Sequence, residues 1–396
     1  MRSAGFDMDR RQLLRTGAVA TGALAFGGSL WRSAWAAPAA TAGVGPYGAL
    51  QAADANGVRL PAGFSSRVLA RTGQVVGRTS YAWHGAPDGG ATFATQTENG
   101  WIYVSNSELD KPGGGASAIR FAGDGRILNA YRILGGTDRN CAGGPTLTGS
   151  TPNTAARWLS GEEVSRGMIW ECDPRGHAAA VPRPAMGKFT HEAAAVDPVR
   201  KVVYLTEDKP DGCFYRFRPA RFPDLSSGVL EVLCASSETG PVTWKPVPDP
   251  SANPTSTRYQ VSGVHRFAGG EGCWYEDDVC YFTTKHDDRV WAYNAATQSI
   301  DLLYDDDAEL RGVDNITMSR SKDLYVAEDG DDMQICMITP DEVVAPFLQL
   351  EGHDGSELTG VAFNPAGNRL YFSSQRGRRG SNDDGFTFEV YGPFRS

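Results

Sequence analysis

Cys141 and the adjacent acids Glu162 and Glu163 are the residues whose types and spacing most clearly suggest chemistry. Cys141 stands in the run Asn-Cys-Ala-Gly-Gly at residues 140–144, and the two acids end the run Trp-Leu-Ser-Gly-Glu-Glu at residues 158–163. In an antiparallel hairpin, the first residue of one strand and the last residue of the next lie at the same end. A single hairpin would therefore bring the thiol close to the two carboxylates.

Five further segments repeat this layout, because each joins an early polar residue to a later strand that ends in polar residues. The six pairs are Asp88 with Glu108, Cys141 with Glu162 and Glu163, Glu192 with Glu207 and Asp208, Glu271 with Lys285, Asp314 with Glu328 and Asp329, and Glu357 with Gln375 and Arg376. Turn residues lie between the two members of most pairs, so each pair reads as one hairpin. We expect all six pairs to gather at one end of the fold.

Carboxylates that converge on one axis repel one another unless protons or cations neutralise them. Oxygen ligands alone favour Ca²⁺, Mg²⁺ or Mn²⁺, whereas a thiolate among them attracts a transition metal such as iron or zinc. The alternative is that these acids are solvated loop residues and that Cys141 is a buried structural thiol. The metal interpretation predicts these ligands: Cys141, Glu162, Glu163, Glu192, Glu271, Asp314, Glu328 and Glu357.

Three further side chains are candidates for direct work on a substrate. Arg376 and Lys285 would stand at the rim of the acidic site, where a cation could bind an anionic substrate or simply offset nearby acids. His191 precedes Glu192 and could bind metal, act as a general acid, or form a hydrogen bond across the site. We list Arg376 and His191 as candidate catalytic residues. No G-x-S-x-G, Walker A or H-E-x-x-H motif is present.

The strands that carry these residues recur at a regular interval. Each contains an aromatic residue, and successive aromatics are separated by 55, 46, 77, 44 and 46 residues: Tyr103, Trp158, Tyr204, Tyr281, Tyr325 and Tyr371. A period of about 45 residues is typical of one four-stranded propeller blade. The sequence predicts an all-β, six-bladed β-propeller with the metal site at one mouth of the central channel. The long interval would contain an inserted surface loop at about residues 219–259, and the last strand, 386–391, would close the ring against residues 64–70.

The N-terminus has the features of an export signal. A twin-arginine run at residues 9–15 precedes an apolar stretch and an Ala-Trp-Ala cleavage site that ends at residue 36. Residues 1–36 are therefore predicted to be a twin-arginine signal peptide, residues 37–60 a poorly ordered lead-in, and residues 61–396 a single propeller domain. We expect the mature protein to be periplasmic or extracellular and to have no membrane anchor, because no later stretch could span a bilayer.

Charge and cysteine content limit the partners. The leader holds five Arg and two Asp, so the mature chain keeps 33 basic and 45 acidic residues, a net charge of −12. This negative charge disfavours nucleic acid as a partner, and we expect a monomer. Seven cysteines leave at least one thiol unpaired, which we take to be Cys141. Cys273 and Cys280 could face each other across a short hairpin.

These residues resemble the PhoX-type alkaline phosphatases, an exported bacterial family of metal-dependent propellers. The resemblance extends from about residue 60 to residue 376 and rests on these pieces: Asn-Cys-Ala-Gly-Gly at 140–144, Trp-Leu-Ser-Gly-Glu-Glu at 158–163, His-Glu-Ala-Ala-Ala-Val-Asp-Pro at 191–198, Asp-Asn at 314–315, and Glu-Leu-Thr-Gly at 357–360. The Cys-Ala-Gly-Gly and His-Glu-Ala-Ala pieces in this order are the most specific.

The resemblance implies a cluster of ferric iron and calcium (Fe³⁺, Ca²⁺) that binds phosphate and hydrolyses a small phosphorylated substrate. It implies Cys141 as the thiolate ligand of iron, and Glu192, Glu271 and Asp314 as metal-binding carboxylates, completed by Glu162 or Glu163. Two alternatives remain open at this point. One is a calcium-dependent lactonase or esterase, and the other is a non-catalytic binding propeller with structural metals, whose mouth the 219–259 loop would plug.

Overall fold

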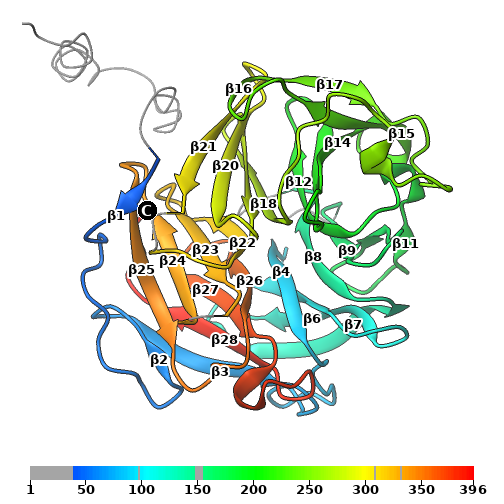
Figure 1. Cartoon of the computed structure of the whole chain (residues 1–396). Helices are drawn as coiled ribbons and strands as arrows, with labels where there is room; N and C mark the ends of the chain where they lie inside the picture. Colours follow the sequence, from blue (N-terminus) through cyan, green and yellow to red (C-terminus); the bar gives the residue numbers. More distant parts are fainter. Residues whose placement is uncertain (1–38, 97–98, 148–154, 307–308, 331) are drawn as a thin grey trace, which may run out of the picture.

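The chain folds into six β-sheets arranged around a central axis (Figure 1). This computed structural model describes residues 39–96, 99–147, 155–306, 309–330 and 332–396. The proposed signal peptide, residues 1–36, lies outside the described residues. The all-β, six-bladed propeller predicted from the strand period is confirmed.

Each blade begins with an inner strand beside the axis and continues outward through antiparallel neighbours. The first three blades are β4 (Pro87–Ala94), β5 (Trp101–Ser107), β6 (Gly114–Phe121) and β7 (Ile127–Thr137); β8 (Asn140–Pro145), β9 (Trp158–Glu162), β10 (Ile169–Cys172) and β11 (Val181–Pro182); and β12 (His191–Asp197), β13 (Val202–Glu207), β14 (Phe214–Arg221), β15 (Asp224–Cys234) and β17 (Thr243–Pro246). The other three are β18 (Gly270–Glu276), β19 (Val279–Thr284), β20 (Arg289–Asn294), β21 (Ser299–Asp305) and β16 (Gly240–Pro241); β22 (Val313–Met318), β23 (Leu324–Glu328), β24 (Gln334–Ile338) and β25 (Val343–Leu350); and β26 (Leu358–Phe363), β27 (Arg369–Ser374) and β28 (Phe386–Tyr391) with β3 (Ser65–Arg71).

The ring closes through the sixth blade, in which the early strand β3 pairs with the last strand β28. Tyr391 lies opposite Ser65 and Phe386 lies opposite Arg71 in this register. Closure by strands from both ends of the domain leaves no open sheet edge between the first and last blades. The predicted pairing of the two chain ends is confirmed.

The lead-in differs from its prediction. Within residues 39–60, β1 (Thr41–Ala42) pairs in parallel with β25, and β2 (Val58–Arg59) pairs with the same strand in the antiparallel sense. The composition, rich in Ala, Gly and Pro, suggested poor order, but the exposed outer edge of β25 supplies backbone partners that composition does not reveal.

The 219–259 segment also differs from the surface loop expected there. β15 and β17 extend the third blade outward, and β16 pairs with β21 of the fourth blade. The prolines of this segment fall at sheet edges and in turns, where a missing N–H donor is tolerated. The long interval therefore holds added edge strands and no additional blade.

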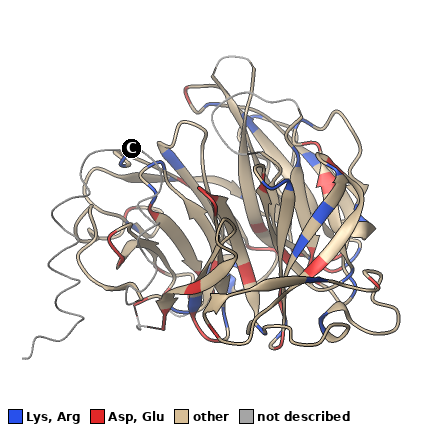
Figure 2. Ribbon diagram, turned by 90° about the horizontal axis from the view of Figure 1, so that it is seen from above, with Lys and Arg blue, Asp and Glu red and all other residues tan. Residues whose placement is uncertain are grey.

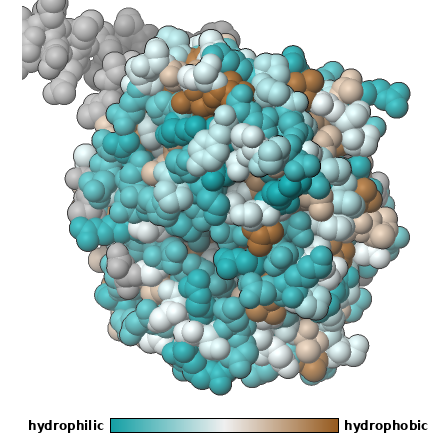
Figure 3. Space-filling model, turned by 45° about the vertical axis from the view of Figure 1, so that its right-hand side comes forward, coloured by the Kyte–Doolittle hydropathy of each residue, from teal (hydrophilic) through white to brown (hydrophobic). Residues whose placement is uncertain are grey.

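The repeated aromatic residues hold the blades together. All six are buried, with at most 1% of each side chain exposed: Tyr103, Trp158, Tyr204, Tyr281, Tyr325 and Tyr371. The rings of Tyr103 and Tyr371 stack with centroids 4.8 Å apart, which joins the first and sixth blades. The surface is mostly hydrophilic, with scattered hydrophobic patches on the face shown in Figure 3. Within the described residues, no helix has the length and apolarity to cross a membrane.

Candidate metal centre

The inner strands are irregular at the same place in every blade. Each has a register shift close to its first residue, where two residues lie between the paired positions on the neighbouring strand. Such a bulge kinks the strand and redirects a side chain. In the first five blades, the first residue of this irregular pair carries a ligand group: Asp88, Cys141, Glu192, Glu271 and Asp314.

A second set of polar residues follows the second strand of each blade. These residues are Glu108, Glu163, Asp208, Lys285, Asp329 and Gln375. The backbone N–H of each donates to the carbonyl of the residue that comes just before the inner strand of the same blade. The hairpin geometry thus brings both members of every predicted pair to one mouth of the channel. Figure 2 shows acidic residues on strands inside the fold as well as on its loops.

These side chains form three overlapping groups, and within each group one potential ligand atom per residue lies within 4.8 Å of the others. The groups are Asp88 with Glu108 and Cys141, Cys141 with Glu163 and Glu192, and Glu192 with Glu271 and Asp314. Cys141 and Glu192 each belong to two groups, so the seven residues form one continuous cluster. Cys141, Glu163, Glu192, Glu271 and Asp314 lie where the sequence predicted them.

Small residues allow the inner strands to approach this closely. The second residue of the bulge is Gly or Ala in the first four blades: Gly89, Ala142, Ala193 and Gly272. A Cβ atom on Gly89 would lie 2.5 Å from the Cα of Ala142 and 2.9 Å from the carbonyl oxygen of Cys141. Any side chain there would push apart the strands that carry Asp88 and Cys141.

Hydrogen bonds between blades fix the backbone of the ligand residues. The Asn106 amide donates to the carbonyl of Cys141 at 3.0 Å, and the Thr283 hydroxyl donates to that of Asp314 at 2.6 Å. The Thr206 hydroxyl donates to the carbonyl of Glu271 at 2.5 Å and accepts the N–H of Ala193 at 2.9 Å. Because these polar groups are buried and paired, the ligand positions are rigidly placed before any ion binds.

Burial and mutual repulsion make the cluster electrostatically costly. Burial, followed by the neighbouring carboxylates, raises the pKa of Asp88 and Glu192 well above the usual range. Burial raises the pKa of Glu163 to about 7 and that of Asp314 to about 8. Burial, and then the charge of Asp88, raises the pKa of the Cys141 thiol. Bound cations would reverse these shifts, because they stabilise the charged forms.

The cluster also contains a buried oxygen with no partner. Oε1 of Glu192 is buried and has no hydrogen-bond donor among the described residues. Oε1 of Glu271 lacks hydrogen-bond geometry but lies 2.7 Å from the Nζ of Lys285, which we regard as an ion pair. Buried carboxylate oxygens are normally hydrogen-bonded or bound to a metal. A set of one thiol and six carboxylates, one of which has an unpartnered buried oxygen, therefore fits metal ions.

Three cationic side chains surround the acids. Arg139 forms ion pairs with Glu108 and, at 2.9 Å, with Glu163. Lys285 contacts Glu271, and Arg376 contacts Glu357 at 2.9 Å. The two rim cations predicted from the sequence thus lie beside the acidic cluster.

Glu162 and Glu328 are not part of the cluster, contrary to the prediction. The Glu162 carboxylate accepts the backbone N–H groups of Asp138 and Met168 at 3.2 and 3.1 Å. Glu328 accepts those of Arg311 and Gln334, both at 3.0 Å. Successive residues of a strand point to opposite faces, so these acids turn toward neighbouring loops while the residue that follows each one lies at the mouth.

His191 and Glu357 also differ from their expected roles. His191 is completely buried; its Nε2 lies 3.0 Å from the carbonyl of Gly187 and its ring lies against Phe189, with centroids 3.7 Å apart. Burial lowers its pKa to about 4. Strand alternation again explains the difference, because Glu192 takes the face toward the cluster. Glu357 lies at the margin, where it contacts Arg376, and belongs to none of the three groups.

The sequence interpretation placed Asp88 and Glu108 at the mouth but left them out of the ligand set. Both lie within reach of Cys141, and its Sγ is 3.5 Å from Oδ2 of Asp88. The Gln375 amide holds the two acids together, since its Nε2 donates to Asp88 at 2.5 Å and to Glu108 at 2.8 Å. The signal that could have identified them was their position in the repeat, which matches that of the Cys141–Glu163 pair.

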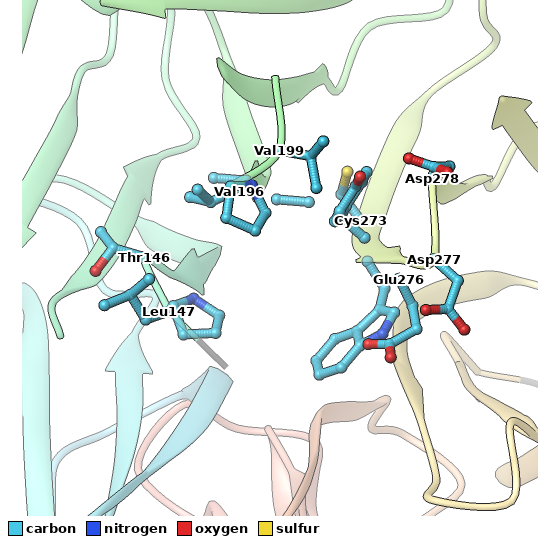
Figure 4. A pocket seen from close by; sticks show the side chains of 14 residues that line it. Thr146, Leu147, Val196, Val199, Cys273, Glu276, Asp277 and Asp278 are labelled. Atoms are coloured by element: carbon cyan, nitrogen blue, oxygen red, sulfur yellow. The ribbon is translucent and has the colours of Figure 1, made fainter. Parts of the chain in front are cut away.

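A separate cavity of about 400 Å³ opens at the other end of the channel, where the turns between first and second strands lie (Figure 4). It is lined by mixed apolar and polar side chains, including Val196, Val199, Cys273 and Glu276. None of the seven cluster residues lines it. The candidate metal centre therefore belongs to the opposite mouth.

Comparison with known proteins identifies the family. The family model of alkaline phosphatase PhoX matches residues 86–301, more than half of the chain, whereas no individual protein of curated function matches. Among solved structures, Pseudomonas fluorescens PhoX in complex with vanadate, a transition state analogue, is similar with a TM-score of 0.70 and 15% identity over 86% of this chain and 97% of that chain. A protein of unknown function from Bacteroides thetaiotaomicron VPI-5482 is similar with a TM-score of 0.52 and 9% identity, over 83% and 76%. These two likenesses concern the fold, and the family assignment rests on the matching model. The chain therefore belongs to the PhoX alkaline phosphatase family, a family of phosphoric ester hydrolases.

Proposed function

We propose that this protein is an exported phosphatase that hydrolyses small phosphate esters at a cluster of iron and calcium in the propeller mouth. The observation that carries the proposal is the continuous cluster of one thiol and six carboxylates. The thiol and four of the carboxylates lie on bulges of consecutive inner strands. The twin-arginine sequence supports export, because that pathway carries folded proteins that can already hold their metals.

The donor types suggest how the ions are divided. The two groups that share Cys141 combine a soft thiolate with carboxylates, which suits iron. The group of Glu192, Glu271 and Asp314 offers only oxygen, which suits calcium. Glu192 belongs to both kinds of group and would bridge them. When bound, these ions would supply the positive charge that stabilises a phosphoryl group in its transition state.

Arg376 and Lys285 are the side chains that we propose to contact the substrate phosphate. The Arg376 side chain is 34% exposed and that of Lys285 is 28% exposed, so each combines an acidic partner with access to solvent. A guanidinium carries five N–H donors, so one contact to Glu357 leaves Arg376 able to bind phosphate as well. In this role Arg376 orients the phosphate, and Lys285 neutralises charge near Glu271.

A small phosphorylated molecule is the expected substrate. The acidic net charge of the chain disfavours nucleic acid, and we propose that the mature protein acts as a monomer without a membrane anchor. The two alternatives drawn from the sequence can be separated from this proposal. Calcium without iron, together with lactone hydrolysis, would favour a lactonase. A mouth plugged by residues 219–259 would mark a binding propeller; in that segment β15 and β17 lie at the outer edge of the third blade, whereas Arg258 contacts Glu207 at 3.0 Å.

The test is hydrolysis of p-nitrophenyl phosphate by protein whose metal content has been measured. We expect turnover that chelation abolishes, and inhibition by vanadate, the ligand of the Pseudomonas fluorescens structure. Arg376→Ala should raise the KM and weaken vanadate binding while the metal content stays unchanged. Arg120→Ala, on β6, the third strand of the first blade, is the control and should change neither the KM nor vanadate binding. A metal-loaded wild-type protein without turnover on phosphate esters would refute the proposal.

A further inference from the structure

A buried histidine lies directly behind Arg376. His353 is completely buried, and its Nδ1 lies 2.8 Å from the hydroxyl of Ser374. The Ser374 hydroxyl donates to that of Ser356 at 2.9 Å, and Ser356 accepts the backbone N–H of Arg376 at 2.8 Å. Three consecutive hydrogen bonds thus connect the imidazole to the backbone of the proposed phosphate-binding arginine.

The partners of His353 allow only one arrangement of its protons. Nε of Arg378 lies 3.3 Å from Nε2 of His353, and a guanidinium can only donate, so Nε2 accepts. Nδ1 therefore carries the proton and donates to Ser374. Burial, and then the charge of Arg378, lowers the pKa of His353 to about 4, in agreement with a neutral ring. The chain of hydrogen bonds consequently has a fixed direction, from Arg378 through His353 and Ser374 to Ser356.

The turn after Arg376 is fixed on its other side as well. Residues Gly377–Arg379 form a short 3-10 helix (η4), and Gly377 has a φ of +61°, which favours glycine. A Cβ atom at Gly377 would lie 1.9 Å from the carbonyl oxygen of Asp384. The Asp384 carboxylate accepts the N–H of Arg379 at 3.0 Å. The backbone of Arg376 is therefore held between this turn and the histidine chain.

We propose that His353 is a positioning residue for phosphate binding: through Ser374 and Ser356, it fixes the backbone from which Arg376 reaches the substrate. This inference rests on the proposed function, because it takes Arg376 to be a phosphate contact. His353 itself touches neither substrate nor metal and transfers no proton. A purely structural role would predict that its loss lowers stability without selectively changing phosphate binding.

The experiment compares His353→Leu with His353→Asn and Ser374→Ala in the metal-loaded, full-length protein. Leucine removes both side-chain hydrogen bonds of His353, whereas the asparagine amide can replace the Nδ1–H donor. We expect His353→Leu and Ser374→Ala to raise the KM for p-nitrophenyl phosphate and the inhibition constant of inorganic phosphate about tenfold, with a smaller change in kcat, as loss of one hydrogen bond to a binding group implies. His353→Asn should recover most of this loss. His177→Asn, an exposed histidine, is the control and should change neither constant.

A double-mutant cycle tests whether the effect acts through Arg376. In an Arg376→Ala background, Ser374→Ala should raise the phosphate inhibition constant no further, because the group that it positions is gone. Additive effects of the two substitutions would overturn the inference, as would unchanged constants in folded, metal-loaded Ser374→Ala. If His353→Leu does not fold, Ser374→Ala gives the same test by removing a single oxygen atom. Absence of turnover in the wild type would refute the proposed function instead, and phosphate binding by calorimetry would then test the positioning role separately.

Discussion

Asp314→Asn should stabilise the metal-free protein at neutral pH, although it removes a proposed ligand. Burial raises the pKa of Asp314 from 3.8 to about 8, with partial relief from Lys285. A carboxyl group whose pKa is raised on folding contributes its full stability below the unfolded pKa, and this contribution is lost as the pH rises toward the folded pKa. The metal-free wild type should therefore lose stability between pH 4 and pH 8, and the neutral asparagine should not.

The magnitude follows from the size of the pKa shift. At pH 7 an ordinary aspartate is ionised in the unfolded chain, while Asp314 keeps its proton in the fold, which costs about 4 kcal/mol at 1.4 kcal/mol per pKa unit. Asparagine retains the carbonyl oxygen that accepts from the Asn315 amide at 2.7 Å, but it leaves Lys285 with fewer acidic neighbours. We therefore expect a net gain of roughly 2 kcal/mol in the free energy of unfolding.

The assay is urea unfolding of wild type and Asp314→Asn at pH 4.5 and pH 8, with chelator and with saturating iron and calcium. We expect the variant to be more stable at pH 8 without metal and less stable with metal, and the two proteins to be alike at pH 4.5 without metal. Asp197→Asn is the matched control, because that buried acid accepts the N–H groups of Val199 and Arg200 at the other end of the fold. Asp197→Asn should lower the free energy of unfolding under every condition. A metal-free Asp314→Asn that is less stable than wild type at pH 8 would refute the reasoning.

Three further predictions concern the scaffold of the propeller. Gly89→Ala should lose bound metal and about 3 kcal/mol of unfolding free energy, because the added methyl group would overlap the neighbouring inner strand. Circular dichroism and metal analysis check this prediction, and a metal-loaded, fully stable variant would contradict it. Thr206→Val should cost about 2 kcal/mol or more, since it leaves the carbonyl of Glu271 and an N–H group buried without a partner; a loss below about 0.5 kcal/mol in urea unfolding would contradict it. The Sγ atoms of Cys273 and Cys280 lie 3.3 Å apart, so the two residues should form a disulfide when the folded protein is treated with the oxidant diamide. Mass spectrometry of the linked peptides checks this prediction, with Cys273→Ser as the control. Two thiols that stay reduced would contradict it.

The period and polarity of the strands were sufficient to predict the propeller, its closure and the mouth that collects the acids. A period near one blade length and polar ends on apolar strands are properties of the sequence itself. The two added strands beside β25 could not be predicted in this way. Their partner is an edge that exists only after the fifth blade has folded, so the local composition of residues 39–60 carries little sign of it.

The choice between adjacent acids was the least predictable part of the site. Glu162 and Glu163 differ by one position, and one position in a strand exchanges the two faces of the sheet. The same alternation turns His191 and Glu192 to opposite faces, and the bulge that begins at Glu192 shifts the alternation for the residues that follow. The positions of the bulges were not predicted from the sequence. The resemblance to a known family indicated Cys141, Glu192, Glu271 and Asp314 in advance, and the structure brings these four residues into one cluster.

The most direct test of the central claim is the metal content of protein exported through its own pathway, measured by mass spectrometry together with its visible absorption. We expect stoichiometric iron and calcium and a thiolate-to-iron absorption band, and Cys141→Ser should lose the band. Cys172→Ser, which removes a buried thiol from the same blade, should keep it. Folded wild-type protein without iron and calcium, or a Cys141→Ser variant that retains the band, would contradict the account.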